Sequence, residues 1–348
     1  MKRRLEWLDM GKGIGMVLVI FAHDHIPTQL KAFIYTFHMP LFFFLSGYLF
    51  SPTKYQRFSN FFTSKFKSLI IPYFSFSVIV YVWFLFRYRI GDIDYNGSLF
   101  KPLIGTIMGE RNTDLTVHIG ALWFLTCLFT TELLFYLIKT GLKRNLFVVI
   151  SIISSSIIGY LYSRSSGAPL LWNFDAASIA VLFFGVGYMY KELTEQISRF
   201  VTIKVLLIVS LLNLMTGYFN YQLSGERVDM YESQYGNYLL FVLSAFSGII
   251  AFLIAVQKLG TNVVFQYIGK NSLIYLALHQ SIVFSLLDMV FKRLLDTDSV
   301  VIGLFLGTIY TIITIIVIAP VAYVIKNDFP YLLGKSGLTR RQITRPKV

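Results

Sequence analysis

The chain has 348 residues, of which 55% are hydrophobic, 17% are aromatic and only 14% are charged. A typical globular domain carries about 25% charged residues, so this composition excludes a soluble enzyme and a disordered chain. The formal net charge is +13, but a nucleic-acid-binding protein gathers its basic residues on one face or arm. We therefore expect a membrane protein without a nucleic-acid partner.

Ten runs of the sequence are apolar and long enough to cross the hydrocarbon core of a membrane as helices. They lie at 10–27, 32–50, 69–87, 117–138, 145–163, 176–190, 203–221, 237–257, 271–290 and 299–325. Their polarity does not alternate, as it would in the strands of a membrane barrel. We predict an all-α, polytopic integral membrane bundle of about ten transmembrane helices. The sixth run is short, which is compatible with a tilted or partly re-entrant helix.

The distribution of basic residues predicts which loops are cytoplasmic. With the amino terminus counted as inside, 22 of the 31 Lys and Arg residues fall in the segments on the inner side. Positively charged loops stay in the cytoplasm, so both termini are predicted to be cytoplasmic. In this interpretation residues 1–333 form one transmembrane domain. The basic tail, 334–348, lies on the inner membrane surface, where anionic lipid holds it.

Cys127 is the only cysteine in the chain. An intramolecular disulfide and a zinc site built from cysteines are therefore excluded, and we expect no metal. Within an apolar run, this residue is most simply a small packing side chain.

Ionisable residues inside the apolar runs are the first candidates for function, because hydrocarbon makes them costly. They are His23, Asp24 and His25 in the first run, His38 in the second, Glu132 in the fourth and His279 in the ninth. Each also has a structural interpretation, as a hydrogen-bonded packing residue. Residue types alone do not decide between the two.

Lys12 and His23 are eleven residues apart. On a helix they are separated by about 16 Å along the axis and by about 20° beyond three full turns. This geometry suits a ligand with an anionic head at the cytoplasmic surface and a reactive end inside the membrane. The alternative is that Lys12 is a snorkelling anchor and His23 a structural histidine.

The segment 51–68 adds four basic residues, including Lys65 and Lys67, on the predicted cytoplasmic side. Lysines bind phosphates as point charges, so this segment and Lys12 could hold a phosphorylated donor such as coenzyme A. The tendency of basic loops to stay inside explains the same residues without a ligand.

Five segments together resemble acyltransferase family 3 over nearly the whole chain. They are WLDMGKGIGMVLVIFAH (7–23), FHMPLFFFLSGYLF (37–50), KFKSLIIPYF (65–74), ALWFLTCLF (121–129) and IGKNSLIYLALHQ (268–280). The most specific part is a basic residue, ten positions and a histidine, which are Lys12 and His23 here. Within the family, the chain is most similar to the fucose 4-O-acetylase-like branch, related to proteins that acetylate surface polysaccharides and Nod factors.

The resemblance implies a multi-pass enzyme of the bacterial inner (plasma) membrane. It would transfer acetyl or another short acyl group from cytoplasmic acyl-coenzyme A to a hydroxyl of a carbohydrate. The acceptor would be exopolysaccharide, capsule, O-antigen or a lipid-linked sugar. No permanently bound cofactor is expected. Membrane lipids and a polysaccharide-synthesis complex are the other expected partners.

The resemblance also assigns roles to residues of this sequence. His23 would act as the general base, Asp24 or another carboxylate would orient its ring, and His38 would form a second polar wall of the cavity. The expected ligands of coenzyme A and the lining of the cavity are Lys12, Lys65, Lys67, Tyr73 and Trp123, with Glu132 and His279 as further polar candidates. Many members have two arginines three apart where this chain has Lys65 and Ser68.

Two other classes of function are compatible with the same residues. A secondary transporter or flippase would use His23, His38 and Glu132 as a relay for a sugar, a lipid-linked glycan or a proton. Inverted repeats often mark that class, and the sequence shows no convincing pair of matched halves. A membrane scaffold for glycan synthesis would need none of these residues.

Overall fold

The computed structural model describes residues 6–24, 26–111, 113, 115–116, 118–165, 168–197, 201–291 and 299–336. Of the side chains, those of 195–197 are not described. The described part of the chain is a bundle of helices without a strand, apart from one isolated antiparallel bridge between Asp229 and Gln234. The predicted all-α polytopic bundle is therefore confirmed.

The helices follow the predicted runs closely. In chain order they are α1 (Glu6–His23), α2 (Thr28–Tyr35), α3 (His38–Leu49), η1 (Pro52–Lys54), α4 (Phe58–Lys65), η2 (Phe66–Ile70), α5 (Ile71–Arg89), α6 (Lys101–Met108), η3 (Gly120–Leu122), α7 (Trp123–Gly141), α8 (Asn145–Ser165), η4 (Leu171–Asn173), α9 (Phe174–Ile197), α10 (Ile203–Ser224), α11 (Tyr238–Leu259), α12 (Val263–Lys270), α13 (Ser272–Leu278), η6 (His279–Phe284), α14 (Ser285–Phe291), α15 (Val300–Asp328) and η8 (Pro330–Leu333).

Nine helical segments within the described ranges are long and apolar enough to cross a membrane. The first predicted run corresponds to α1, which is not among the nine and whose 18 residues include three charged ones, Glu6, Asp9 and Lys12. The sixth run, expected to be short, belongs to α9 and extends over 24 residues. The three charged residues set α1 apart from the nine apolar segments, although α1 carries both Lys12 and His23.

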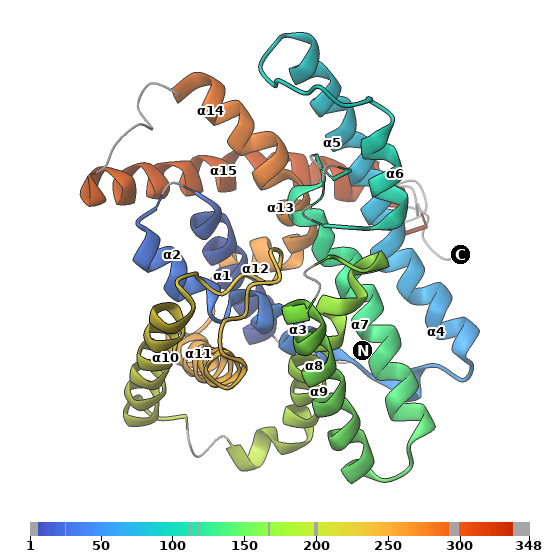
Figure 1. Cartoon of the computed structure of the whole chain (residues 1–348), viewed down its shortest axis with the longest axis vertical. Helices are drawn as coiled ribbons and strands as arrows, with labels where there is room; N and C mark the ends of the chain where they lie inside the picture. Colours follow the sequence, from blue (N-terminus) through green and yellow to red (C-terminus); the bar gives the residue numbers. More distant parts are fainter. Residues whose placement is uncertain are drawn as a thin grey trace, which may run out of the picture.

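The central helix α1 packs against the short helix α12, which the apolar runs did not predict (Figure 1). Two glycines make this close packing possible. A Cβ on Gly13 would collide with the backbone carbonyl of Phe265, and a Cβ on Gly269 would collide with that of Asp9. Small residues let helix backbones approach closely in membrane bundles. The packing fixes the end of α1 that carries Lys12 against α12.

Helices α3 and α9 form a second glycine-mediated pair. A Cβ on Gly47 would meet the carbonyl of Phe184, and a Cβ on Gly187 would meet that of Phe44. Buried aromatic rings extend this packing, with Phe50 5.2 Å from Phe184 between ring centroids. The result is a rigid support for α3, whose first residue is His38.

Two helical stretches are π-helical, η2 and η6. One π-helical stretch begins directly after Lys65, and the other begins at His279. Such wide turns are rare and are frequent at functional sites, because they redirect side chains within an otherwise regular helix. Both stretches adjoin residues that the sequence had singled out.

Candidate active site

Three histidines meet where three helical segments begin or end. His23 is the last residue of α1, His38 is the first of α3, and His279 is the first of η6. The ring centroid of His23 lies 5.2 Å from that of His279 and 6.5 Å from that of His38. The fold therefore brings together histidines that are up to 256 positions apart in the sequence.

Hydrogen bonds of the same kind orient all three rings, because each Nδ1 atom lies beside the backbone carbonyl oxygen of the residue one turn earlier. The distances are 2.7 Å from His23 to Val19, 3.0 Å from His38 to Ile34 and 2.9 Å from His279 to Tyr275. A carbonyl oxygen only accepts, so Nδ1 carries the proton, and Nε2 of each neutral ring is left with its lone pair. This is the tautomer that a general base needs.

A cavity of about 180 Å³ opens beside the rings of His23 and His38. His23 and His38 line it from the helices, and Trp123 at the start of α7 lines it as well. The segment 225–237 between α10 and α11, here called the outer loop, closes the cavity with four polar residues. They are Arg227, Asp229, Tyr231 and Glu232. We call this space the histidine cavity.

Charges on the outer loop give the histidine cavity a polar wall. Nη2 of Arg227 lies 2.9 Å from Oδ2 of Asp229, and its guanidinium carbon lies 4.6 Å from the centre of the Tyr35 ring. Burial raises the pKa of Glu232, and the nearby carboxylate of Asp229 raises it further. The wall thus carries the ion pair of Arg227 with Asp229 and a second carboxyl group, that of Glu232.

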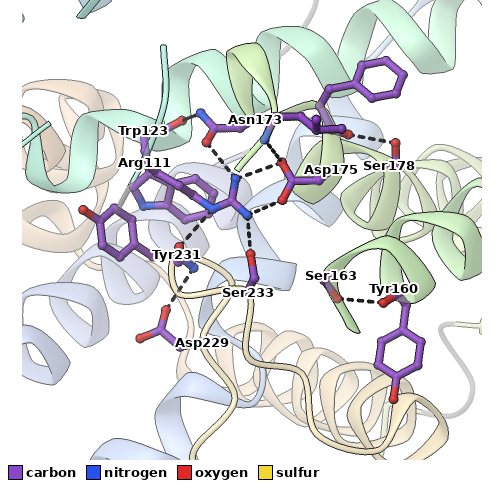
Figure 2. A network of polar contacts seen from close by, with 12 residues as sticks. Arg111, Trp123, Tyr160, Ser163, Asn173, Asp175, Ser178, Asp229, Tyr231 and Ser233 are labelled. Atoms are coloured by element: carbon purple, nitrogen blue, oxygen red, sulfur yellow. Dashed lines mark hydrogen bonds and ion pairs between the residues drawn. The ribbon is translucent and has the colours of Figure 1, made fainter. Parts of the chain in front are cut away.

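A buried arginine from a different loop holds the outer loop in place (Figure 2). Arg111 donates from Nη1 to Asn173 and Asp175 at 2.9 and 3.0 Å, and from Nη2 to Asp175 and Ser233 at 2.5 and 2.6 Å. Its Nε donates to the carbonyl oxygen of Tyr231 at 2.9 Å. All five donors of the guanidinium group are used in this way. Arg111 therefore acts as a clamp, with no donor left for a substrate.

A second cavity, of about 260 Å³, lies at the opposite end of α1 from His23. Four lysines line this cavity, which we call the lysine pocket. They are Lys12 from α1, Lys270 from α12, Lys326 from α15 and Lys335 after η8. Ser68 and Asn271 add a hydroxyl and an amide, while Asp9 is the carboxylate of the lining. A cluster of lysine side chains of this kind suits a ligand that carries phosphate groups.

One glycine positions the last of these lysines. Gly334 ends η8 in the left-handed conformation, with φ 66°, and a Cβ there would collide with the backbone carbonyl of Lys67. Glycine is the residue that adopts this conformation without steric cost. The carboxyl-terminal segment thereby lies against η2, which places Lys335 at the lysine pocket.

The predicted donor ligand Lys65 is held in an ion pair inside the bundle. Its Nζ lies 3.0 Å from Oε1 and 2.9 Å from Oε2 of Glu132, and 5.6 Å from the centre of the Phe50 ring. The Glu132 side chain is only 6% exposed. The geometry thus joins α4 to α7 through two of the sequence candidates.

The other sequence candidates have different surroundings. Asp24 is buried directly after α1, and the Nδ1 atom that it was predicted to orient is bonded to Val19. Tyr73 is buried and donates from its hydroxyl to the carbonyl oxygen of Thr106 at 2.8 Å. Lys67 is exposed. His25 and residues 337–348 of the basic tail lie outside the described residues.

Several site residues were missed because the sequence interpretation treated their charges only as signs of topology. Arg111 and Arg227 are two of the nine basic residues on the predicted outer side. Lys270, Lys326 and Lys335 were counted only among the basic residues of the inner segments. An arginine on the outer side goes against the usual charge bias, which is the signal that would have identified the first two.

The fold and site define a polytopic membrane protein with a histidine cavity and a lysine pocket at opposite ends of one helix. Among the described residues, no group of three or more His, Cys, Asp or Glu side chains is placed to hold a metal ion. A family model described as an acyltransferase domain matches residues 5–325. The chain therefore belongs to acyltransferase family 3. No curated protein and no solved structure matches it.

Proposed function

We propose that this membrane acyltransferase transfers acetyl or another short acyl group from acyl-coenzyme A to a carbohydrate hydroxyl. The observation that carries the proposal is the pairing of two unlike sites on α1. Lys12 lines a cationic pocket on the predicted cytoplasmic side, and His23 lines a polar cavity eleven residues further along the helix. A donor with an anionic head and a reactive thioester end fits that order.

The lysine pocket is the proposed site for the phosphates of coenzyme A. Four cationic side chains from three helices and the segment after η8 converge there, whereas Lys65 is engaged by Glu132. Ser68 lines the pocket at the second position of the family's basic pair. We infer that this chain binds the donor phosphates mainly through Lys12, Lys270, Lys326 and Lys335.

His23 is the proposed general base. Its Nε2 lone pair takes the proton of the sugar hydroxyl as the hydroxyl oxygen attacks the thioester carbonyl carbon. The carbon–sulfur bond then breaks, and the imidazolium returns the proton to the departing thiolate. The ester and free coenzyme A are the products. The Val19 carbonyl holds the required tautomer throughout.

A covalent variant uses the same residue differently. Nε2 of His23 would attack the thioester, release the thiol and pass the acyl group on to the acceptor hydroxyl. This route predicts thiol release before any acceptor is added, in an amount equal to the enzyme. Direct transfer predicts no such burst, so rapid-quench measurement of free thiol separates the two.

The test is an assay of purified protein in lipid nanodiscs with acetyl-coenzyme A and oligosaccharides from the surface glycan of the producing cells. We expect acceptor-dependent release of free thiol and an acceptor mass increased by one acyl group. His23→Ala should abolish both while the protein still binds coenzyme A. Movement of the glycan without thiol release would contradict the proposal and favour a transporter.

The proposed setting is the bacterial inner membrane, where surface glycans are assembled. The predicted sidedness places the lysine pocket in the cytoplasm, where acyl-coenzyme A is made, and the outer loop on the other side. An accessibility assay tests this sidedness. A cysteine introduced at Lys270 should react with an impermeant thiol reagent only in inverted vesicles, and one introduced at Glu226 only in intact spheroplasts.

A further inference from the structure

A third cavity, which is also polar, adjoins the histidine cavity. It measures about 600 Å³, against about 180 Å³ for the histidine cavity. Its walls come from α8, the end of α10 and the outer loop. Arg227 lines both cavities, so the two spaces lie next to each other on either side of that side chain. We call the larger space the loop pocket.

The lining of the loop pocket suits a polar ligand that is rich in hydroxyl groups. Leu223 is the one aliphatic side chain among its lining residues. The remaining side chains supply hydroxyls, amides, two tyrosine rings, two arginines and one glutamate. Hydroxyls and amides both donate and accept hydrogen bonds, as sugar hydroxyls require. A lipid chain would need an apolar lining, and a polyanion would need an excess of cations without a carboxylate.

The walls of the loop pocket are fixed by hydrogen bonds within the protein. The hydroxyl of Tyr160 donates to the carbonyl oxygen of Gly236 at 2.8 Å, which ties α8 to the outer loop. Backbone bonds of 2.7 and 2.9 Å join Asp229 and Gln234 across the loop. Arg111 holds Ser233 from the other side (Figure 2). When the walls of a pocket are already ordered, less of the binding free energy is lost in ordering them.

Several side chains of the lining remain available to a ligand, Arg164 and Gln234 among them. Arg164 at the end of α8 is exposed, and Gln234 is half-buried, with its backbone alone used in the bridge to Asp229. Both lie on the predicted outer side. They are therefore the side chains to change without removing the supports of the loop.

We propose that the loop pocket binds an extended saccharide of two or more sugar units. The saccharide presents the hydroxyl of its terminal unit past Arg227 to His23. The histidine cavity is small, whereas the loop pocket falls in the range of about 300–1,000 Å³ that is typical of ligand-binding pockets. The inference rests on the proposed function, because it names the site that selects the acceptor.

The experiment compares a long and a short acceptor. The long one is an oligosaccharide of three or more units prepared from the surface glycan of the producing cells, and the short one is the monosaccharide mixture from its complete hydrolysis. Gln234→Trp fills the loop pocket, and Gln234→Ala removes a polar contact. Gln222→Trp is the matched control, since Gln222 is exposed on α10 and outside the pocket lining.

We expect Gln234→Trp to lower kcat/KM for the oligosaccharide at least about tenfold, the loss of one or two hydrogen bonds. The value for the monosaccharides should stay within about twofold of wild type. Gln234→Ala should raise KM for the oligosaccharide without lowering kcat. Equal losses for both acceptors, or no difference from Gln222→Trp, would overturn the inference.

A binding measurement separates this inference from the proposed function. Saturation-transfer NMR reports oligosaccharide binding without requiring acyl transfer. If the wild type binds the oligosaccharide without transferring acyl groups, and Gln234→Trp does not bind it, the loop pocket is supported and the proposed function fails. If wild type transfers acyl groups and Gln234→Trp binds as well as Gln222→Trp, the loop pocket alone is refuted. Neither binding nor transfer in wild type would refute both.

Discussion

The two ends of α1 differ in how their polar groups are held. At the histidine cavity, each imidazole is fixed by a backbone carbonyl, and the facing loop is clamped by the fully buried Arg111. At the lysine pocket, Lys270, Lys326 and Lys335 are exposed and only Lys12 is half-buried. Chemistry that moves a proton needs fixed geometry, whereas attraction of a phosphate tolerates several arrangements of charge. The histidine cavity should therefore be much more sensitive to single substitutions.

The largest effect should come from His23 itself. His23→Gln removes the base and keeps an amide of similar size, so we expect the transfer rate to fall about 10²–10⁴-fold. Binding of acyl-coenzyme A, measured by calorimetry, should be unchanged. A similar loss of donor affinity in His23→Gln would show that the two ends of α1 are not separate in function.

The clamp should matter next. Arg111→Met leaves the Asp175 carboxylate buried without its partner, which costs about 3–5 kcal/mol for pairs of this kind. We expect a large fall in the midpoint of thermal unfolding in detergent and loss of transfer. The double variant Arg111→Met with Asp175→Leu should recover most of the stability, but not the activity, because the outer loop remains unclamped. Full recovery of activity in the double variant would contradict the clamp.

Lys65 provides the sharpest contrast between a structural and a donor-binding lysine. Lys65→Met removes the partner of Glu132, and we expect about 1–3 kcal/mol of destabilisation, since an unsatisfied buried group remains. KM for acyl-coenzyme A should change less than twofold. If the stability is unaltered and KM rises tenfold, Lys65 is a donor ligand in spite of its ion pair.

Removal of one lysine from the lysine pocket should have a moderate effect. Lys12→Ala should raise KM for acyl-coenzyme A about tenfold, because a hydrogen bond to a charged group contributes about 1.5–3 kcal/mol. The difference from wild type should shrink at high salt. Lys258→Ala is the matched control, as Lys258 is exposed at the end of α11 and outside the pocket lining. Equal effects of the two variants on KM would indicate that Lys12 acts only through the overall surface charge and not as a ligand of the donor.

The smallest effect concerns pH and the outer loop. Because burial and Asp229 raise the pKa of Glu232 above 4.5, ionisation of this group opposes folding. Its contribution to stability is present below pH 4.5 and is lost as the pH rises through the folded pKa. Glu232→Gln should therefore have a slightly higher unfolding midpoint than wild type at pH 8, and the two should converge near pH 4. A lower midpoint at pH 8 would contradict this sign.

The sequence predicted the helices well because hydrocarbon imposes a length and an apolar composition on each one. The helix α12 was not predicted, because it has only eight residues and is held by tertiary packing against α1. No local sequence pattern reveals such packing. Helix α6, also of eight residues, packs against α5 and was missed for the same reason. Short helices of this kind depend on neighbours that are distant in the chain.

The candidate site was predicted in part. His23, His38 and His279 were indicated because ionisable side chains are costly to place in hydrocarbon. The structure brings all three rings together. The lining residue Arg227 was missed because it lies in a loop between helices, outside the apolar runs that were searched for costly polar residues, and its place on the outer side was the one signal it gave. The pairing of Lys65 with Glu132 joins positions 67 residues apart and was likewise invisible to local patterns. Spacing along one helix, as between Lys12 and His23, was the one geometric relation that the sequence could supply.

The most direct test of the account is a pair of measurements on purified His23→Ala and Lys12→Ala. Calorimetry gives the affinity for coenzyme A, and free-thiol release gives the transfer rate at saturating donor. We predict that His23→Ala binds the donor like wild type and does not transfer, while Lys12→Ala binds about tenfold more weakly and transfers at a near-normal rate once saturated. Wild-type transfer by His23→Ala, or unchanged donor affinity in Lys12→Ala, would contradict the division of labour along α1.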